Sequence, residues 1–193
     1  MKRVQNGRQL FDKYKSVICA LVYIAKLFPL KFKKSLLVLF RGKKGTVGIV
    51  LRYIFLKSIL PDMGDNVVVY EDVYLKNPEH MHIGNNVSIH PMSYIEAIGG
   101  LRIGDDVSIA HAVTIMTVSH QYQNPEVPIK YQGFDRGEVI IQDNVWIGAK
   151  ATLLCGVTIE EGSIVGAAAL VNKSVSSNSI VGGIPAKFIK KRV

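Results

Sequence analysis

Residues 141–170 read IQDNVW-IGAKAT-LLCGVT-IEEGSI-VGAAAL, which is five hexapeptides in succession. Each hexapeptide opens on an aliphatic residue, and its fifth position holds Val, Ala or Ser. Helices and hairpins have no six-residue period, whereas a chain coiled into a triangular prism does, because each flat side takes about one hexapeptide. The opening aliphatic side chain then points inward and stacks on its counterpart in the next coil, about 4.8 Å away. The repeat therefore predicts an all-β fold, a parallel β-helix.

The same pattern continues upstream with slips in register, in blocks that begin at Met63, Ile83 and Ile103. Gly, Asn and Asp follow these positions and suit the tight turns at the corners of a prism. We expect each slip to be a small bulge at a corner. One long polar stretch, at about 121–138, has no six-residue period and is predicted to be an excursion loop, and loops of this length are usually functional.

Charge divides the chain of 193 residues into two parts. Residues 1–60 hold fourteen Lys or Arg and one acidic residue, a net charge of +13, whereas residues 61–193 carry −4. The first part is also apolar, so we expect a basic helical segment (1–60) followed by one β-helix domain (61–193). Its longest apolar run is about half of the ~20 residues that a transmembrane helix needs. A membrane-surface segment that binds anionic lipid and a set of helices packed on the prism both remain open.

Two cysteines and five histidines show no metal-ligand spacing, so we expect no metal site. The scarcity of cysteine favours a reducing, cytoplasmic compartment, and the basic segment lacks a nucleic-acid-binding motif, so no nucleic-acid partner is expected. One histidine stands apart. His120 ends a regular coil and opens the long loop, where its side chain can face a groove or simply mark a corner.

The segment 63–193 resembles the hexapeptide-repeat acyltransferases, and most of all their maltose, galactoside and surface-polysaccharide O-acetyltransferase branch. The matching features are the step Ser119-His120, the run 143–148 with its tryptophan, and the C-terminal sequence GGIPAK at 182–187. The resemblance implies a left-handed β-helix, a homotrimer, and transfer of an acetyl group from acetyl-CoA to a sugar hydroxyl. His120 becomes the candidate general base, because a neutral imidazole can take the hydroxyl proton near neutral pH.

The resemblance also implies a coenzyme A site in the groove between two prisms. Its candidate residues flank the pantetheine arm or reach the nucleotide phosphates, where positive charge is useful. They are Trp146, Ala149 and Ala167 for the arm, and Lys173, Lys187 and Lys190 for the phosphates.

The acceptor position departs from the family pattern. Related enzymes carry an acceptor-binding Asn in an earlier coil, where this chain has His90, so we expect a different acceptor and hold His90 and Glu96 as candidate sugar ligands. Lipid-linked sugars of surface-polysaccharide synthesis fit a membrane-surface segment. Two other classes remain open: transfer to an amino sugar or a xenobiotic hydroxyl, and a β-helix that only binds or assembles. The long loop and His120 argue against the second class.

Overall fold

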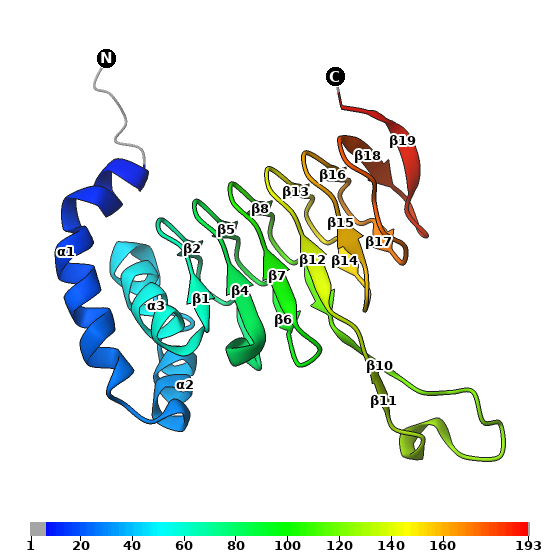
Figure 1. Ribbon diagram of the computed structural model, residues 1–193, viewed down its shortest axis with the longest axis horizontal. Helices are drawn as coiled ribbons and strands as arrows, with labels where there is room; N and C mark the ends of the chain where they lie inside the picture. The colour runs from blue at the N-terminus through cyan, green and yellow to red at the C-terminus, as the bar shows by residue number, and fades with distance from the viewer. Residues whose placement is uncertain (1–6, 193) are drawn as a thin grey trace.

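The computed structural model describes residues 7–192, which form three helices followed by a stack of β-coils (Figure 1). The helices are α1 (Gly7–Lys26), α2 (Leu30–Leu39) and α3 (Gly45–Ile59). Helix α3 packs against the first coil, and α1 and α2 pack in turn against α3. Leu56 of α3 is completely buried at this junction, and Tyr53 and Ile59 are buried beside it. The helices therefore cover the N-terminal end of the β-helix.

Three parallel sheets form the sides of a prism, which we call faces A, B and C in the order that the chain visits them. Each coil contributes one short strand to each face. Face A holds β1 (Asp62–Met63), β4 (Met81–Ile83), β7 (Leu101–Ile103), β12 (Val139–Ile141) and β15 (Thr158–Ile159). Face B holds β2 (Val68–Val69), β5 (Ser88–Ile89), β8 (Ser108–Ile109), β13 (Trp146–Ile147), β16 (Ile164–Val165), β18 (Ser179–Gly182) and the antiparallel β19 (Lys187–Lys191). Face C holds β3 (Tyr74–Lys76), β6 (Tyr94–Glu96), β9 (Thr114–Met116), β14 (Thr152–Leu153) and β17 (Leu170–Val171).

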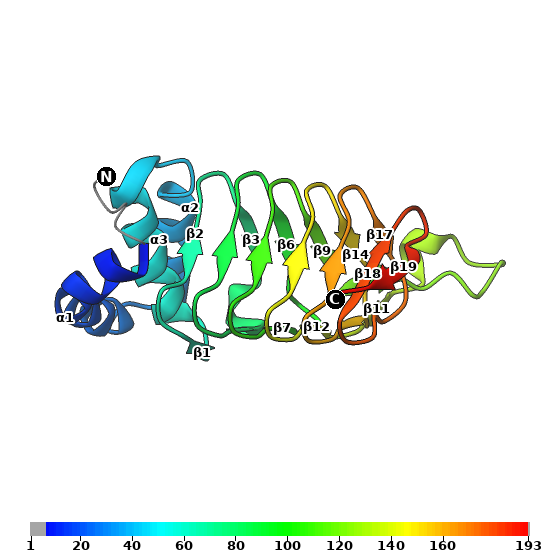
Figure 2. The same ribbon diagram turned by 90° about the horizontal axis from the view of Figure 1, so that it is seen from above.

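The hexapeptide pattern is confirmed as the core of this prism. The residues that open the five hexapeptides are all buried, and so are those at the fifth positions. Along face B, for example, Ile89, Ile109 and Ile147 are in register in neighbouring strands and are each 0% exposed. Burying one such side chain contributes about 1.5–3 kcal/mol. Figure 2 shows the coils stacked in a row from the helices at one end to β18 and β19 at the other.

Left-handed backbone conformations recur in coil after coil at two of the three corners. The edge between faces A and B turns at Asn66, Asn86, Asp106 and Asn144, with φ of 55–57°. The edge between faces B and C turns at Asp72, Met92, Ala112, Lys150 and Ala168, with φ of 56–63°. Asn and Asp adopt this region more readily than most residues, as the sequence predicts for the A/B edge. The alanine and lysine at the B/C edge show that the coil imposes the conformation there.

The register slips fall at the third corner, the C/A edge. Partner residues on face A are 20 positions apart in the early coils, as in Met63 and Ile83, but 18 apart between Ile141 and Ile159. Two short inserts occupy this edge, one of them containing the 3-10 turn η1 (Pro78–His80). The long excursion leaves from the same edge, after β9. It is a hairpin of β10 (Val118–His120) and β11 (Phe134–Arg136), whose tip holds the 3-10 turn η2 (Ile129–Tyr131).

The helices are short or interrupted by charge. Between residues 7 and 192, no helix combines the length and the apolar character that crossing a bilayer requires.

Candidate active site

The hairpin that carries His120 projects away from the prism (Figure 1). His120 ends β10 and lies opposite Phe134 of β11, with the two ring centroids 4.5 Å apart. The His120 side chain is exposed, and within residues 7–192 neither of its ring nitrogens has a hydrogen-bond partner. The imidazole is thus held by packing on one aromatic ring, and both nitrogens are free to accept or donate a proton.

The base of the hairpin is anchored to the preceding C/A corner. Thr117 is completely buried; its hydroxyl donates to the Glu96 carbonyl at 2.9 Å and accepts the Gly99 N–H at 2.9 Å. The Gly137 N–H closes the base by donating to the Thr117 carbonyl at 3.0 Å. A methyl group at Gly99 would overlap that same carbonyl oxygen. A rigid base therefore positions a histidine on an otherwise exposed hairpin.

The tip of the hairpin is ordered by one amide side chain. The Gln132 amide donates to the carbonyls of Asn124 and Val127, at 2.8 and 2.6 Å, and accepts the Asn124 N–H at 3.0 Å. Several large apolar side chains on the hairpin nevertheless remain exposed, namely Tyr122, Ile129, Tyr131 and Phe134. Exposed apolar side chains gathered in this way are typical of a surface that another molecule covers.

The predicted residues of the pantetheine site gather on face B and the adjoining B/C edge. Trp146 points outward from β13, 53% exposed, between Ser108 and Ile164 of the neighbouring strands. Ala149 and Ala167 lie in successive coils at the B/C edge, where the Ala168 N–H donates to the Ala149 carbonyl at 2.8 Å. Within residues 7–192, the N–H groups of Ala149 and Ala167 have no acceptor. A ligand that lies along this edge would therefore meet small side chains and free backbone donors.

His90 lies at the same B/C edge, two coils nearer the N-terminus. Its ring stacks on Tyr70 of the coil before it, with centroids 4.7 Å apart. Burial, and after it the neighbouring His111, lowers the pKa of His90 below its usual value. The neutral imidazole is thus favoured, which can both accept and donate a hydrogen bond. The sequence reasoning missed Tyr70 and His111, although the 20-residue spacing of the early coils places Tyr70 beneath His90.

Glu96, the other predicted acceptor ligand, lies on β6 at the opposite end of face C. Its Oε1 accepts hydrogen bonds from the Asn77 side chain at 2.8 Å and from the Ile98 N–H at 2.9 Å. These bonds fix the insert at the C/A edge. Glu96 and His90 therefore lie at opposite ends of face C, and a role of Glu96 as an acceptor ligand stays a prediction.

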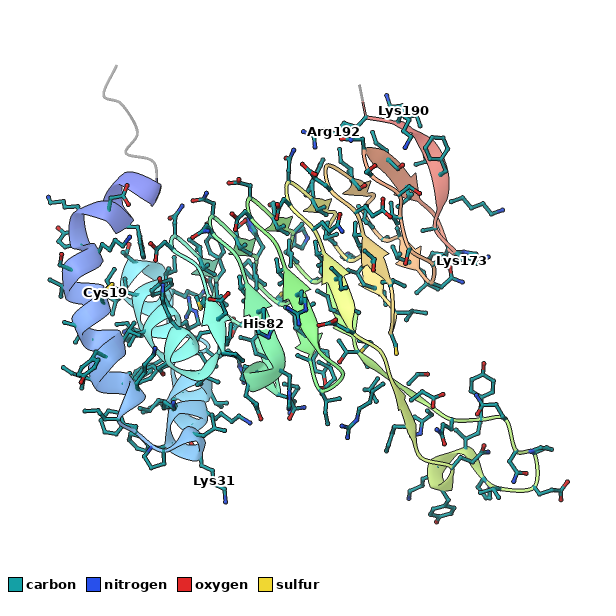
Figure 3. All side chains as sticks on the ribbon, viewed as in Figure 1. Cys19, Lys31, His82, Lys173, Lys190 and Arg192 are labelled. Atoms are coloured by element: carbon teal, nitrogen blue, oxygen red, sulfur yellow. The ribbon has the colours of Figure 1, made fainter. Side chains whose placement is uncertain are left out.

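The three predicted phosphate-binding lysines are all exposed but do not form one cluster. Lys187 and Lys190 lie on β19, whereas Lys173 lies at the C/A edge after β17. Figure 3 shows Lys173 and Lys190 well apart on the C-terminal part of the prism.

Within one chain, the candidate groups form two separate sets. Trp146 lies on face B, and His120 extends from the C/A edge, which is the corner opposite that face. A ligand that contacts both residues must therefore lie between two prisms.

No group of three or more His, Cys, Asp or Glu side chains suited to a metal ion occurs between residues 7 and 192. Cys19 and Cys155 are both free thiols.

The sequence matches known proteins of one family. Residues 138–173 match the family described as bacterial transferase hexapeptide (six repeats). The chain is 41% identical over 143 residues to a chloramphenicol acetyltransferase of Escherichia coli, covering 66% of this chain and 68% of that protein. It is 30% identical over 141 residues to the galactoside O-acetyltransferase of Escherichia coli strain K12, covering 70% of this chain and 66% of that protein. The chain therefore belongs to the hexapeptide-repeat transferase family.

Among solved structures, a galactoside acetyltransferase in complex with coenzyme A is similar over 89% of this chain and 82% of that one. The TM-score is 0.76 and the sequence identity 27%. In the sequence comparisons, the chain spans a smaller share of its relatives: 66%, 58% and 37% of the lengths of three curated proteins. The family and the fold are thus shown, as the sequence predicts.

Proposed function

We propose that this protein is an acetyl-CoA-dependent O-acetyltransferase that acts on a sugar hydroxyl. The observation that carries the proposal is His120, an exposed imidazole on a firmly anchored hairpin, whose two ring nitrogens have no hydrogen-bond partner among the described residues. The similarity to a galactoside O-acetyltransferase and to a coenzyme A complex supports acetyl-CoA as the donor. A β-helix that only binds or assembles needs neither the histidine nor the hairpin.

The proposed reaction needs one proton acceptor and no covalent enzyme intermediate. A ring nitrogen of His120 takes the proton of the acceptor hydroxyl while the hydroxyl oxygen attacks the thioester carbonyl. The new C–O bond gives a tetrahedral intermediate, whose oxyanion needs a backbone N–H donor. The C–S bond then breaks, and the coenzyme A thiolate takes the proton from the His120 imidazolium. The products are the acetylated sugar and free coenzyme A.

The active site in this proposal lies between two subunits of a homotrimer. One subunit supplies face B with Trp146 and the adjoining B/C edge, where the N–H groups of Ala149 and Ala167, which have no acceptor within residues 7–192, accommodate the pantetheine arm. The neighbouring subunit supplies His120 on its hairpin, whose exposed apolar side chains would be covered by the contact. Lys187 and Lys190, on the β19 extension of face B, are better placed than Lys173 for the nucleotide phosphates of that site. Analytical ultracentrifugation tests the assembly, and a monomer that binds acetyl-CoA tightly contradicts it.

The acceptor is proposed to be a saccharide of surface-polysaccharide synthesis, including lipid-linked forms. The neutral His90, stacked on Tyr70, provides an aromatic and hydrogen-bonding surface of the kind that sugar rings use. A xenobiotic hydroxyl is the second candidate, because the chain is 41% identical to a chloramphenicol acetyltransferase. Coenzyme A release, measured with glycosides, nucleotide sugars and chloramphenicol, separates the two. Turnover confined to chloramphenicol contradicts the saccharide proposal, and no turnover with any acceptor contradicts both.

We also propose that the outer face of α1 and α2 rests on an anionic membrane. Residues 1–60 carry a net charge of +13, and the two outer helices expose many apolar side chains next to lysines. These apolar residues are Val17, Leu21, Tyr23, Ile24, Leu27, Phe28, Leu30, Phe32, Val38 and Leu39. Removing residues 1–60 would also strip α3 from the first coil, so surface substitutions are the cleaner test.

The membrane test uses phosphatidylglycerol vesicles at low and high salt. Replacing Lys26 and Lys31 by Gln should weaken vesicle binding by up to about 30-fold, at roughly 1 kcal/mol per charge that reaches the surface. The matched control replaces Lys130 and Lys150, which are equally charged and exposed but lie on the hairpin and the prism. Equal effects of the two pairs, or no vesicle binding at low salt, contradict the proposal.

A further inference from the structure

A cavity of about 360 Å³ lies between α2, α3 and the first coil, at the end of the molecule opposite the C-terminal strands. Its size is within the range of small-molecule sites. Four of its lining residues are cationic and none is acidic: Lys34, Arg41, Arg52 and Lys76. The rest of the wall is mainly aliphatic and comes from α2 and the first coil. The cavity is therefore suited to a ligand with an anionic group and an apolar part.

Arg52 is the unusual residue of this cavity, because it is a cation only 1% exposed. Its Nε donates to the Val69 carbonyl at 2.8 Å, and its Nη1 donates to three carbonyls in the segment that follows α2, at 2.7–3.2 Å. Its Nη2 has no hydrogen-bond partner within the described chain, although it is buried. A buried guanidinium normally has all its donors satisfied. The unpaired Nη2 therefore marks a position for an acceptor atom.

The charges around Arg52 leave the cavity positive. Burial lowers the pKa of the Arg52 guanidinium, while Glu71 and Asp72 act in the opposite direction. Neither acidic residue lines the cavity or forms an ion pair with Arg52. Lys34 is engaged by Glu79 at 2.6 Å, and Arg41 lies over the ring of Tyr74, 4.0 Å from its centroid. Lys76 makes no side-chain hydrogen bond within residues 7–192.

The apolar side of the cavity runs toward an exposed apolar surface. Leu37, Val69 and Val73 are buried in its wall, while Val38 lines the cavity and is 59% exposed. Leu39, next to Val38 on α2, is exposed as well. A hydrocarbon chain could thus pass from the cationic end of the cavity to the outer face of α2.

From this arrangement we infer that the cavity binds the phosphate group of an amphiphile. The phosphate accepts hydrogen bonds from Arg52 Nη2, Arg41 and Lys76, and the chain lies against the aliphatic wall. Guanidinium groups suit this role, because their donors match phosphate oxygens. This site is separate from the proposed acetyl-transfer site and does not depend on it.

Calorimetry on the full-length protein tests the inference with three probes: decyl phosphate below its micelle concentration, inorganic phosphate and the uncharged decyl maltoside. Decyl phosphate should bind at least about tenfold more tightly than either of the others. Arg41→Gln and Lys76→Gln should each weaken that binding about 5- to 10-fold, in line with the loss of a charge-assisted hydrogen bond. Lys150→Gln, a surface charge on the prism, is the matched control and should leave the affinity unchanged.

Arg52 itself is followed without substitution, since its four hydrogen bonds to carbonyl groups also hold the fold. In the ¹⁵N-labelled wild-type protein, decyl phosphate should shift the Arg52 side-chain resonances. Equal affinities for inorganic phosphate and decyl phosphate would contradict the binding of an amphiphile and leave a free phosphate as the ligand. Equal affinities for decyl maltoside and decyl phosphate, no binding of any probe, or unshifted Arg52 resonances would overturn the anion site.

Discussion

Replacing His120 by Ala should separate catalysis from stability. The side chain is exposed, contacts Phe134 and has no hydrogen-bond partner within residues 7–192. Its loss should therefore change the free energy of unfolding by no more than about 0.5 kcal/mol and the melting temperature by about 1–2 °C. Loss of a general base, in contrast, lowers kcat by about 10²–10⁴-fold, or roughly 2.7–5.4 kcal/mol in the activation barrier. The rate effect is thus expected to be several times larger than the effect on stability.

The assay is steady-state release of the coenzyme A thiol, with calorimetry of acetyl-CoA binding and a thermal melt on the same samples. The His120→Ala protein should bind acetyl-CoA within about twofold of wild type, because the imidazole acts on the acceptor hydroxyl. His80→Ala is the matched control, an exposed histidine on η1 near the helices, and should retain normal turnover. Turnover of His120→Ala within about threefold of wild type would remove the general-base role.

Three further predictions concern the base of the hairpin, His90 and the core of the prism. Gly99→Ala should place a methyl group on the Thr117 carbonyl, shift the hairpin and lower kcat while acetyl-CoA still binds; unchanged kcat would contradict the anchoring argument. The pKa of His90 is lower in the folded protein than in the unfolded chain, so the unfolded chain binds the proton at a higher pH. The free energy of unfolding therefore falls as pH drops below about 6.5. Denaturant titrations at about pH 5 and 7 should show that His90→Gln reduces this loss, and an unchanged pH dependence would speak against it. Ile109→Ala, at a completely buried core position, should cost about 2–5 kcal/mol and lower the melting temperature by about 5–15 °C, with a smaller shift counting against a tightly packed prism.

The fold could be predicted from the sequence because its buried aliphatic residues recur every six positions. Ile141, Ile147 and Leu153 open successive hexapeptides, and they lie on the three successive faces of one coil. The turn residues of the A/B edge were equally readable, since Asn and Asp tolerate left-handed conformations. The B/C edge was not, because Ala168 and Lys150 have no such preference.

The candidate site could be predicted from the sequence only in part, because its geometry depends on which face and which edge of the prism each residue occupies. His120 stood out because the period ends there, but its position opposite face B requires the closed prism. The stacking of His90 on Tyr70 depends on the 20-residue spacing of the early coils. The role of Arg52 had no signal in the sequence, because a single arginine in a basic helix resembles its solvated neighbours. For residues 1–60, the sequence left two alternatives: helices packed on the prism, or a membrane-surface segment. Helix α3 packs on the prism, as the first alternative predicts, whereas α1 and α2 keep exposed outer faces.

The central claim is an acetyltransferase site shared between two subunits, with His120 from one and Trp146 from the next. The most direct test co-expresses His120→Ala and Trp146→Glu chains with different tags and isolates the trimers that carry both tags. Each mutant trimer alone should be inactive. In any mixed trimer, one of the three boundaries joins an intact His120 to an intact Trp146, so coenzyme A release should recover to about one third of the wild-type rate. If both residues served a site within one chain, every mixed trimer would remain inactive, and the shared-site account would be wrong.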